Sequence, residues 1–180
     1  MKYESLIFDI DGTLWDSRAL VAEGYNIQLC AEGLPHLCVN AEQLKALFGK
    51  VMTEIADVIL ETIPVEERYA LMERCMETEN RYLYENECKI GYPAVKETIA
   101  ELAKKYRLFI VSNSQCGYPE LCINKLGLAP YIQGHLCFGD TGTSKGKTIR
   151  TLMEAHNITS CAYIGDTQGD YEATVEAGVP

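Results

Sequence analysis

Four short apolar runs along the chain each stop at polar residues, a pattern that predicts buried β-strands. The runs cover residues 3–8, 107–111, 135–138 and 161–164. The first stops at Asp9, the second at Ser112, and the last at Gly165 and Asp166. Polar side chains at strand ends are candidates for chemistry, because loops on a rigid scaffold carry most binding and catalytic groups.

Apolar residues at helical spacing fill the intervals between the later strands. Pro93 suits a first helical position and begins one such pattern. Further helices are expected over residues 119–127, around residues 149–153 and over residues 170–177. Strands that alternate with helices form a parallel sheet, and ligands then bind beyond the carboxyl ends of the strands. The fold class is therefore α/β with a parallel sheet.

The stretch between the first two strands breaks this alternation, because it contains no convincing strand. Helical runs are expected there over residues 20–30, 42–48, 51–60 and 66–84. We therefore expect an α/β core made of residues 1–15 and 90–180, interrupted by a helical insertion of residues 16–89.

Two carboxylates separated by one residue, Asp9 and Asp11, follow the first strand and precede Gly12. One aspartate suffices for a turn, and two close carboxylates repel each other unless a cation lies near them. Magnesium takes one or two carboxylates together with water and phosphate oxygens. A second acidic pair, Asp166 and Asp170, would reach the same edge if the last strand neighbours the first. These residues predict a magnesium site.

Side chains that could bind an anionic oxygen occur in two places, directly after the second strand and just before the helix expected around residues 149–153. Ser112 and Asn113 offer a hydroxyl and an amide, and Lys145 or Lys147 would supply the positive charge that phosphoryl transfer requires. Together with the acidic pairs, these groups predict a phosphoryl-transfer site with Mg²⁺ as cofactor.

The charge of the chain narrows the class of partner. A formal net charge of −10 and a pI near 4.8 repel polyphosphate backbones and anionic lipid, so neither nucleic acid nor membrane is expected as a partner. No stretch approaches the eighteen apolar residues of a spanning helix, and the N-terminus has no apolar segment of secretory type. We expect a cytoplasmic protein that acts on a small phosphorylated metabolite.

Eight cysteines are scattered along the chain without a C-x-x-C pair, and their spacing fits no zinc site. Several lie on apolar helix or strand patterns, so we expect small buried hydrophobic residues rather than disulfides or metal ligands. They are Cys30, Cys38, Cys75, Cys88, Cys116, Cys122, Cys137 and Cys161.

Four segments in chain order, DIDGT, VSNS, TGTSK and GDTQGD, resemble the four motifs of the haloacid dehalogenase superfamily. The resemblance covers essentially the whole chain and is to the phosphoglycolate-phosphatase-like branch, which has a helical cap inserted after the first motif. It implies a Rossmann-like core and hydrolysis of a phosphomonoester. Asp11 favours this branch, because the dehalogenases that name the superfamily need no metal and lack an aspartate at that position.

The resemblance implies a role for each catalytic residue. Asp9 would be the nucleophile that forms an aspartyl-phosphate, and Asp11 would be the general acid and then the general base. Lys145, with Lys147 as the alternative, would neutralise the charge on the phosphate and the nucleophile.

The same resemblance implies the binding residues. Ser112, Asn113 and Lys145 would bind the phosphate. Asp9, Asp11 and Asp166 would be the metal ligands, and Asp170 would support the ligands without contacting the metal itself.

The helical insertion would close over the substrate, exclude water and set specificity. Arg18, just after the first motif, and Lys50, in a glycine-containing break between helices, are candidate substrate contacts. The alternative for each is a surface cation.

Two alternatives stay open at the level of sequence. A hexose-phosphate mutase similar to β-phosphoglucomutase would use the same acidic pair and differ mainly in how the cap admits a sugar phosphate. The core also shows four strands where the family's sheet usually has at least five. The chain would then either dispense with the last strand or be a truncated, non-catalytic form that binds phosphate.

Overall fold

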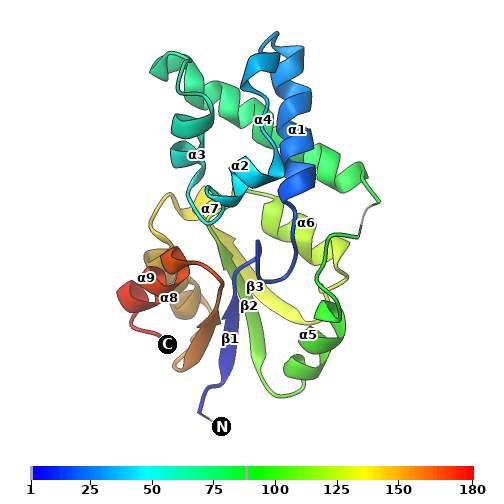
Figure 1. The fold of residues 1–180 in the computed structure, drawn as a ribbon. Coiled ribbons are helices and arrows are strands. Elements are labelled where there is room, and N and C mark those ends of the chain that lie inside the picture. Colours follow the sequence, from blue (N-terminus) through cyan, green and yellow to red (C-terminus); the bar gives the residue numbers. More distant parts are fainter. Residues whose placement is uncertain (1, 88) are drawn as a thin grey trace. The chain divides into compact units, whose positions relative to one another are not determined.

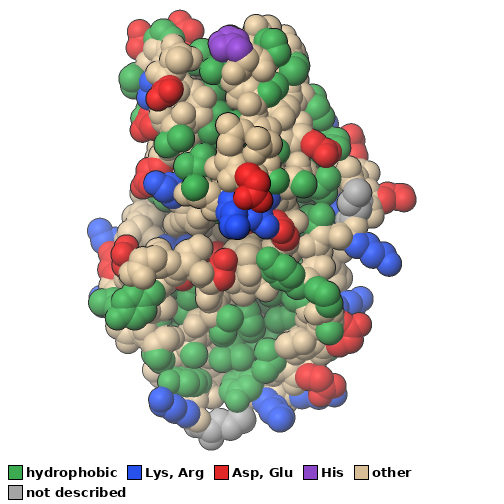
Figure 2. Space-filling view, viewed as in Figure 1, with side chains coloured by type: hydrophobic (Ala, Val, Ile, Leu, Met, Phe, Trp, Pro, Cys, Tyr) green, Lys and Arg blue, Asp and Glu red, His purple; other side chains and the backbone are tan. Residues whose placement is uncertain are grey.

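The computed structural model describes residues 2–87 and 89–180, and the chain divides into two compact units (Figure 1). The core unit comprises Met1–Asp16 and Ile90–Pro180, and the helical unit comprises Ser17–Lys89. Among the described residues, none of the helices combines the length and the apolar character that a membrane-spanning segment requires. Acidic and basic side chains are interspersed on the face that Figure 2 shows.

A parallel sheet of four strands forms the centre of the core unit. β1 (Ser5–Phe8) lies between β2 (Arg107–Ser112) and β4 (Cys161–Ile164). β3 (Ile132–Cys137) pairs with the other edge of β2, which gives the order β3-β2-β1-β4. The prediction of an α/β protein with a parallel sheet is confirmed.

Helices cover both faces of this sheet in the described part of the core unit. They are α5 (Val95–Ala103), α6 (Tyr118–Lys125), α7 (Phe138–Thr141), α8 (Lys145–Ala155) and α9 (Gln168–Ala177). Because side chains alternate along a strand, Phe109 and Val111 of β2 face the same way and pack with Ile149 and Leu152 of α8. Figure 1 shows α8 and α9 on one side of the sheet and α5 and α6 on the other.

Several element boundaries differ from the sequence-based expectation, and two of them have a visible cause. The third strand begins at Ile132 rather than at residue 135, since its pairing with β2 continues through a register shift between Leu108 and Phe109. The prediction that Pro93 is the first helical residue is wrong. Ala94 has a left-handed backbone with φ of 59°, which is incompatible with a right-handed helix, and α5 starts only at Val95.

The described residues of the helical unit form helices and no strand. These elements are α1 (Arg18–Ala31), the 3₁₀ turn η1 (Pro35–Leu37), α2 (Ala41–Lys45), α3 (Met52–Ile59) and α4 (Val65–Glu85). α1 packs closely on α4 at Gly24, where an added Cβ would lie 2.8 Å from the Cα of Glu79. Tyr25 and Leu29 of α1 and Met72 of α4 are buried, and together they form the apolar interior of this unit.

The cysteines depart in part from the expectation that they are buried hydrophobic residues. That expectation is confirmed for Cys75, Cys122, Cys137 and Cys161. It is wrong for Cys30 and Cys116, which are exposed. Cys38 is half-buried, with its Sγ 3.7 Å from that of Cys30, and Cys88 lies outside the described residues.

Candidate active site

The carboxyl ends of three strands meet at one edge of the core sheet. Phe8, the last residue of β1, pairs with Ile110 of β2 and with Ile164 of β4. The backbone N–H of Asp9 donates to the carbonyl of Ile164 at 2.8 Å, which continues the pairing one residue beyond β1. The segments that follow these strands therefore converge, as the strand pattern leads us to expect.

A tight turn after Asp9 brings the first segment against the segment that follows β4. The backbone N–H of Leu14 donates to the carbonyl of Ile10 at 2.8 Å, and Gly12 has φ of +81°. A Cβ built on Gly12 would lie 2.1 Å from Oδ2 of Asp166. Glycine is required here for two reasons, because the backbone is left-handed and because Asp166 occupies the space of a side chain.

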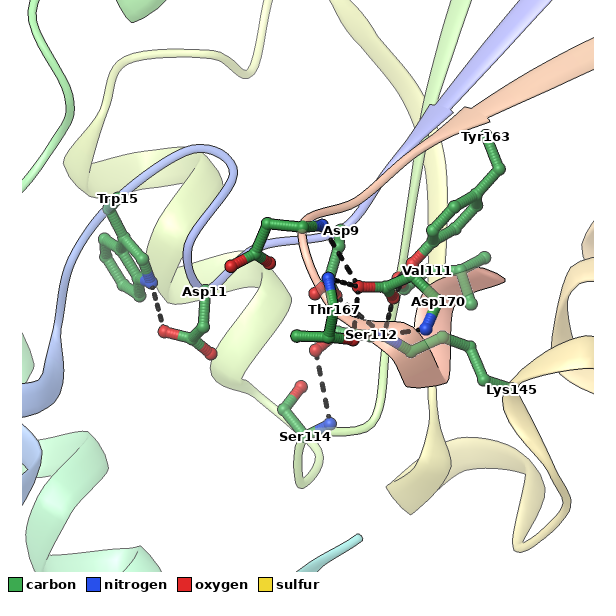
Figure 3. Close-up of polar contacts among 11 residues, drawn as sticks. Asp9, Asp11, Trp15, Val111, Ser112, Ser114, Lys145, Tyr163, Thr167 and Asp170 are labelled. Atoms are coloured by element: carbon green, nitrogen blue, oxygen red, sulfur yellow. Dashed lines mark hydrogen bonds and ion pairs between the residues drawn. The ribbon is translucent and has the colours of Figure 1, made fainter. Parts of the chain in front are cut away.

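A buried lysine links two buried carboxylates at this edge (Figure 3). Nζ of Lys145 lies 3.1 Å from Oδ1 of Asp9 and 2.6 Å from Oδ1 of Asp170. Lys145 begins α8, Asp170 lies in the first turn of α9, and Asp9 follows β1. Each of the three side chains is only 4% exposed, so water screens these ion pairs weakly.

The electrostatic environment distinguishes the two carboxylates. Burial is the largest influence on the pKa of Asp9 and raises it; Lys145 opposes the rise, Asp170 and Asp11 reinforce it, and the resulting pKa is about 7. Burial also raises the pKa of Asp170, but the charge and hydrogen bond of Lys145, together with hydrogen bonds from Thr167, hold it below its usual value. Burial lowers the pKa of Lys145, but Asp9 and Asp170 outweigh this effect and raise it.

Asp170 is held in place by a capping box at the start of α9. The Thr167 hydroxyl donates to Oδ2 of Asp170 at 2.7 Å, and the Thr167 backbone N–H donates to the same oxygen at 3.0 Å. In return, the Asp170 backbone N–H donates to Oγ1 of Thr167 at 3.1 Å. The hydroxyl of Tyr163 lies 3.3 Å from Oδ1 of Asp170 and donates to the carbonyl of Val111 at 2.9 Å. Asp170 is thus fixed from several elements.

Asp11 has a different set of neighbours. Nε1 of Trp15 and the hydroxyl of Tyr118 each donate to its Oδ1 at 2.8 Å. The two aromatic rings meet edge to face, with centroids 5.4 Å apart. Trp15 is fully buried and Tyr118 nearly so, which gives the carboxylate of Asp11 a defined orientation beside an apolar wall.

The segment after β2 presents small polar side chains. Oγ of the buried Ser112 accepts a hydrogen bond from the Ser114 backbone N–H at 3.3 Å, and Asn113 lies between them, half-buried. Oγ of Ser114 is itself buried and has no hydrogen-bond partner among the described residues. Such a hydroxyl costs about 1–3 kcal/mol when nothing bonds to it, so Ser114 is a further candidate for contact with a ligand.

The acidic residues at this edge fit a hard divalent cation. Carboxylate oxygens of Asp9, Asp166 and Asp170 lie within 4.8 Å of one another. Lys145 balances only one of these three negative charges, and oxygen donors in this arrangement suit Mg²⁺. The carboxylate of Asp11, which we also predicted as a ligand, lies against Trp15, as Figure 3 shows. It also accepts the hydrogen bond from Tyr118.

The sequence matches the family model described as haloacid dehalogenase-like hydrolase over residues 6–180. The chain belongs to this family. The prediction of a haloacid dehalogenase superfamily member of the phosphoglycolate-phosphatase-like branch is therefore confirmed, and so is its Rossmann-like fold.

Relatives of known name agree with this placement. The chain is 28% identical over 188 residues to the phosphoglycolate phosphatase of Photorhabdus laumondii, covering 98% of this chain and 77% of the relative. It is 29% identical over 184 residues to that of Agrobacterium fabrum, covering 97% and 77%. A haloacid dehalogenase-like family hydrolase from Streptococcus pneumoniae has a TM-score of 0.81 at 18% identity, covering 99% of this chain and 82% of that chain, which shows a shared fold.

The structure of this haloacid dehalogenase-like hydrolase gives the positions of the four basic residues that we predicted as site residues. Of the two candidate lysines, Lys145 is buried beside Asp9, whereas Lys147 is exposed. Arg18 begins α1 and Lys50 lies between α2 and α3, both within the helical unit. Nζ of Lys50 lies 3.9 Å from Oε2 of Glu54 in an exposed ion pair.

Several residues around the site escaped the sequence reasoning. Thr167 could have been found, because the spacing T-x-x-D before a helix is a capping-box signal. Ser114 lies within the VSNS segment that was already singled out. Tyr118 gave no local signal, because it is 107 residues away from Asp11 in the sequence.

Proposed function

We propose that this chain is a Mg²⁺-dependent phosphatase that hydrolyses a small phosphomonoester through an aspartyl-phosphate on Asp9. The observation that carries the proposal is the ion pair between the buried Asp9 and Lys145, on a turn that also carries Asp11. The phosphoglycolate phosphatases among its relatives support a small substrate of this kind.

In the first step an oxygen of Asp9 attacks phosphorus. The bond between phosphorus and the ester oxygen breaks as the new bond to Asp9 forms, and Asp11 gives its proton to the departing alkoxide. The hydrogen bonds from Trp15 and Tyr118 hold Asp11 at the end of the turn, which supports its role as a positioned acid.

In the second step water releases the phosphate. Asp11, now ionised, takes a proton from a water molecule, whose oxygen attacks phosphorus while the bond to Asp9 breaks. Inorganic phosphate leaves, and Asp9 is again a carboxylate. The protonation states of Asp9 and Asp11 at the end of the cycle match those at the start.

The remaining residues bind and orient. Lys145 offsets charge on Asp9 and the phosphoryl group, while Ser112, Asn113 and Ser114 offer donors to phosphate oxygens. Asp9 and Asp166 would hold Mg²⁺, which supplies positive charge to the phosphoryl oxygens when bound. Asp170 keeps Lys145 in place through their 2.6 Å ion pair. A role for Asp11 as a third metal carboxylate stays a prediction.

The helical unit is proposed as the cap that selects the substrate. Arg18 and Lys50 are its candidate contacts with an anionic group of the substrate. Exchanging each for glutamine should raise KM and leave kcat unchanged, because the residue is proposed to bind the substrate and not to take part in the reaction. Lys45→Gln, an exposed position on α2, is the control and should leave KM unchanged.

The test is release of p-nitrophenol from p-nitrophenyl phosphate, with and without Mg²⁺. Asp9→Asn should lower kcat by at least about 10³-fold, as loss of a nucleophile does. Glu101→Gln, an exposed carboxylate paired with Lys104, is the control and should leave the rate unchanged. Magnesium-dependent turnover that survives Asp9→Asn contradicts the proposed nucleophile.

Asp11→Asn separates the two steps. Nitrophenolate is a good leaving group that needs little protonation, so this variant should still transfer the phosphoryl group to Asp9 but should lack the base for hydrolysis. A burst of about one equivalent of nitrophenol followed by very slow turnover is expected. A panel of phosphoglycolate, hexose phosphates and nucleotides then identifies the substrate, with isomerisation of hexose phosphate as the result that favours a mutase.

A further inference from the structure

A second cluster of potential metal ligands lies where β2 and β3 end: Cys137 is the last residue of β3, Asp140 follows it in α7, and Cys116 lies in the segment after β2. Sγ of Cys137 lies 3.0 Å from Oδ2 of Asp140, and Sγ of Cys116 lies 3.5 Å from Oδ1 of the same carboxylate. The donor atoms of the three residues all lie within 4.8 Å of one another. Cys116 and Asp140 are exposed and Cys137 is buried, so the cluster is open to solvent on one side.

The close approach of the two segments depends on a glycine. A Cβ on Gly139 would lie 2.5 Å from the backbone nitrogen of Cys116 and 2.8 Å from its Sγ. The Gly139 backbone N–H donates to the carbonyl of Ser114 at 3.1 Å, which ties the segments together. The two thiols are thus brought to one carboxylate although 21 positions separate them in the sequence.

The carboxylate itself has a fixed orientation. The backbone N–H of Cys137 donates to Oδ2 of Asp140 at 2.8 Å, and Cys137 stands at the N-cap of α7 in a capping box. Serine, threonine, asparagine and aspartate are the strong residues at this position, whereas a thiol is a weak hydrogen-bonding group. A cysteine here departs from the local preference, and such departures concentrate at functional sites.

The thiols and the carboxylate of the cluster lie within hydrogen-bonding reach of one another. Cysteine binds metal ions as the thiolate, so a bound divalent cation would take the place of the two thiol protons.

We propose that Cys116, Cys137 and Asp140 bind a thiophilic divalent cation of the Zn²⁺ type, with solvent in the fourth position. Two thiolates and one carboxylate suit zinc or cadmium rather than magnesium. With bonds of about 2.3 Å to sulfur and 2.0–2.2 Å to oxygen, tetrahedral ligands stand about 3.5–3.8 Å apart. The 3.5 Å from Sγ of Cys116 to Oδ1 of Asp140 meets this value. The 3.0 Å from Sγ of Cys137 is to the other oxygen, Oδ2, so the side chains would need a small adjustment to place both thiolates around a cation held by one of these oxygens.

This site is distinct from the carboxylate cluster around Lys145, and the inference does not rest on the proposed phosphatase activity. Both cysteines are free thiols, and each lies close to an oxygen of Asp140. Three potential ligand atoms within 4.8 Å of one another favour a cation.

The experiment is a titration with Cd²⁺ at saturating Mg²⁺, monitored by the ultraviolet charge-transfer absorbance of cadmium thiolates. The fully reduced protein carries Cys30→Ser, Cys38→Ser and Cys88→Ser, which removes the adjacent thiols of the helical unit and the thiol outside the described residues. We expect a band that saturates at one equivalent and that Zn²⁺ abolishes by competition. Oxygen ligands produce no such band, so Cd²⁺ bound by Asp9 and Asp166 does not contribute to the absorbance.

Three variants in that background decide the assignment. Cys116→Ser should lose most of the band and bind at least about tenfold more weakly, and Asp140→Asn should also weaken binding. Glu120→Gln removes a negative charge that acts on Cys116 but removes no donor of the cluster, and it should retain the band. An absent band, or a band unchanged by Cys116→Ser, overturns the proposal. Circular dichroism of each variant establishes that a lost band is not lost folding.

Discussion

Two clusters of polar side chains in the core unit are built on the same local motif but differ in the groups that surround its carboxylate. In each, the residue at a helix N-cap and an aspartate three positions later form a capping box: Thr167 with Asp170 in α9, and Cys137 with Asp140 in α7. In the first box the carboxylate pairs with the buried Lys145. In the second it receives two thiols.

The difference shows how much a shared backbone motif leaves undecided. The box fixes the position of a carboxylate in both cases, but the neighbours decide what that carboxylate does. Lys145 and the other aspartates make the first cluster an oxygen-rich site, which suits a hard cation. Cys116 and Cys137 make the second a sulfur-rich site, which suits a soft one. The variants below alter one cluster at a time.

The largest effect is expected from Lys145→Met. Two carboxylates would lose their buried partner, and breaking one buried ion pair typically costs about 3–5 kcal/mol. The free energy of unfolding, measured by urea denaturation without added metal, should fall by about this amount. Lys147→Met, two residues along the same helix but exposed, should change it by less than about 0.5 kcal/mol. Equal effects of the two substitutions would mean that the pairs of Lys145 do not stabilise the fold.

The contrast between these two lysines also shows which features of the site can be predicted from the sequence and which cannot. The strand ends and the acidic pairs could be predicted because apolar runs that stop at aspartates are local patterns, and the order of the motifs identified the family. The choice between Lys145 and Lys147 could not be made, because it depends on which face of α8 packs on the sheet. That face is set by Ile149 and Leu152, whose spacing predicts a helix but not its orientation.

The second cluster was missed for a related reason. Known zinc motifs are recognised by pairs of cysteines close in sequence, and Cys116 and Cys137 are far apart. Their proximity follows from the parallel pairing of β2 with β3, which aligns Ser112 with Cys137. Only the strand order, β3 next to β2, brings the segment after β2 to the segment after β3. A pattern search along the chain does not contain that information.

An intermediate effect is expected from Gly12→Ala, which tests the approach of Asp166 to the first cluster. The new methyl group would collide with the carboxylate of Asp166, so Mg²⁺ dependence should shift to at least about tenfold higher concentration, as loss of a supporting contact does for metal sites. Gly33→Ala is the matched control, since Gly33 has a similar φ of +75° but open space around it. It should cost about 1–2 kcal/mol of backbone strain and leave the Mg²⁺ dependence unchanged. If the Mg²⁺ dependence of Gly12→Ala is unchanged, Asp166 does not bind the metal.

A smaller effect is expected from Thr167→Ala, which removes the hydroxyl from the first capping box. Loss of an N-cap costs about 1 kcal/mol, and the free energy of unfolding from urea denaturation should fall by that amount. Thr151→Ala is the control, because the exposed Thr151 hydroxyl donates to a carbonyl of its own helix, that of Lys147. Alanine is the better helix former there, so that variant should be as stable as the parent or more so. Equal stability of Thr167→Ala and the parent would show that the box does not hold Asp170.

The smallest effect on stability is expected from Cys137→Ser, which makes the second box resemble the first. Serine is a strong N-cap and can donate to Asp140 as the thiol does, so the free energy of unfolding should change by less than about 1 kcal/mol while the Cd²⁺ band is lost. Cys122→Ser is the control, since Cys122 is fully buried and its substitution places a hydroxyl among apolar side chains at a cost of about 1–3 kcal/mol. If Cys137→Ser is as destabilising as Cys122→Ser, the thiol of Cys137 serves packing rather than a cation, and the two boxes differ in structure as well as in chemistry.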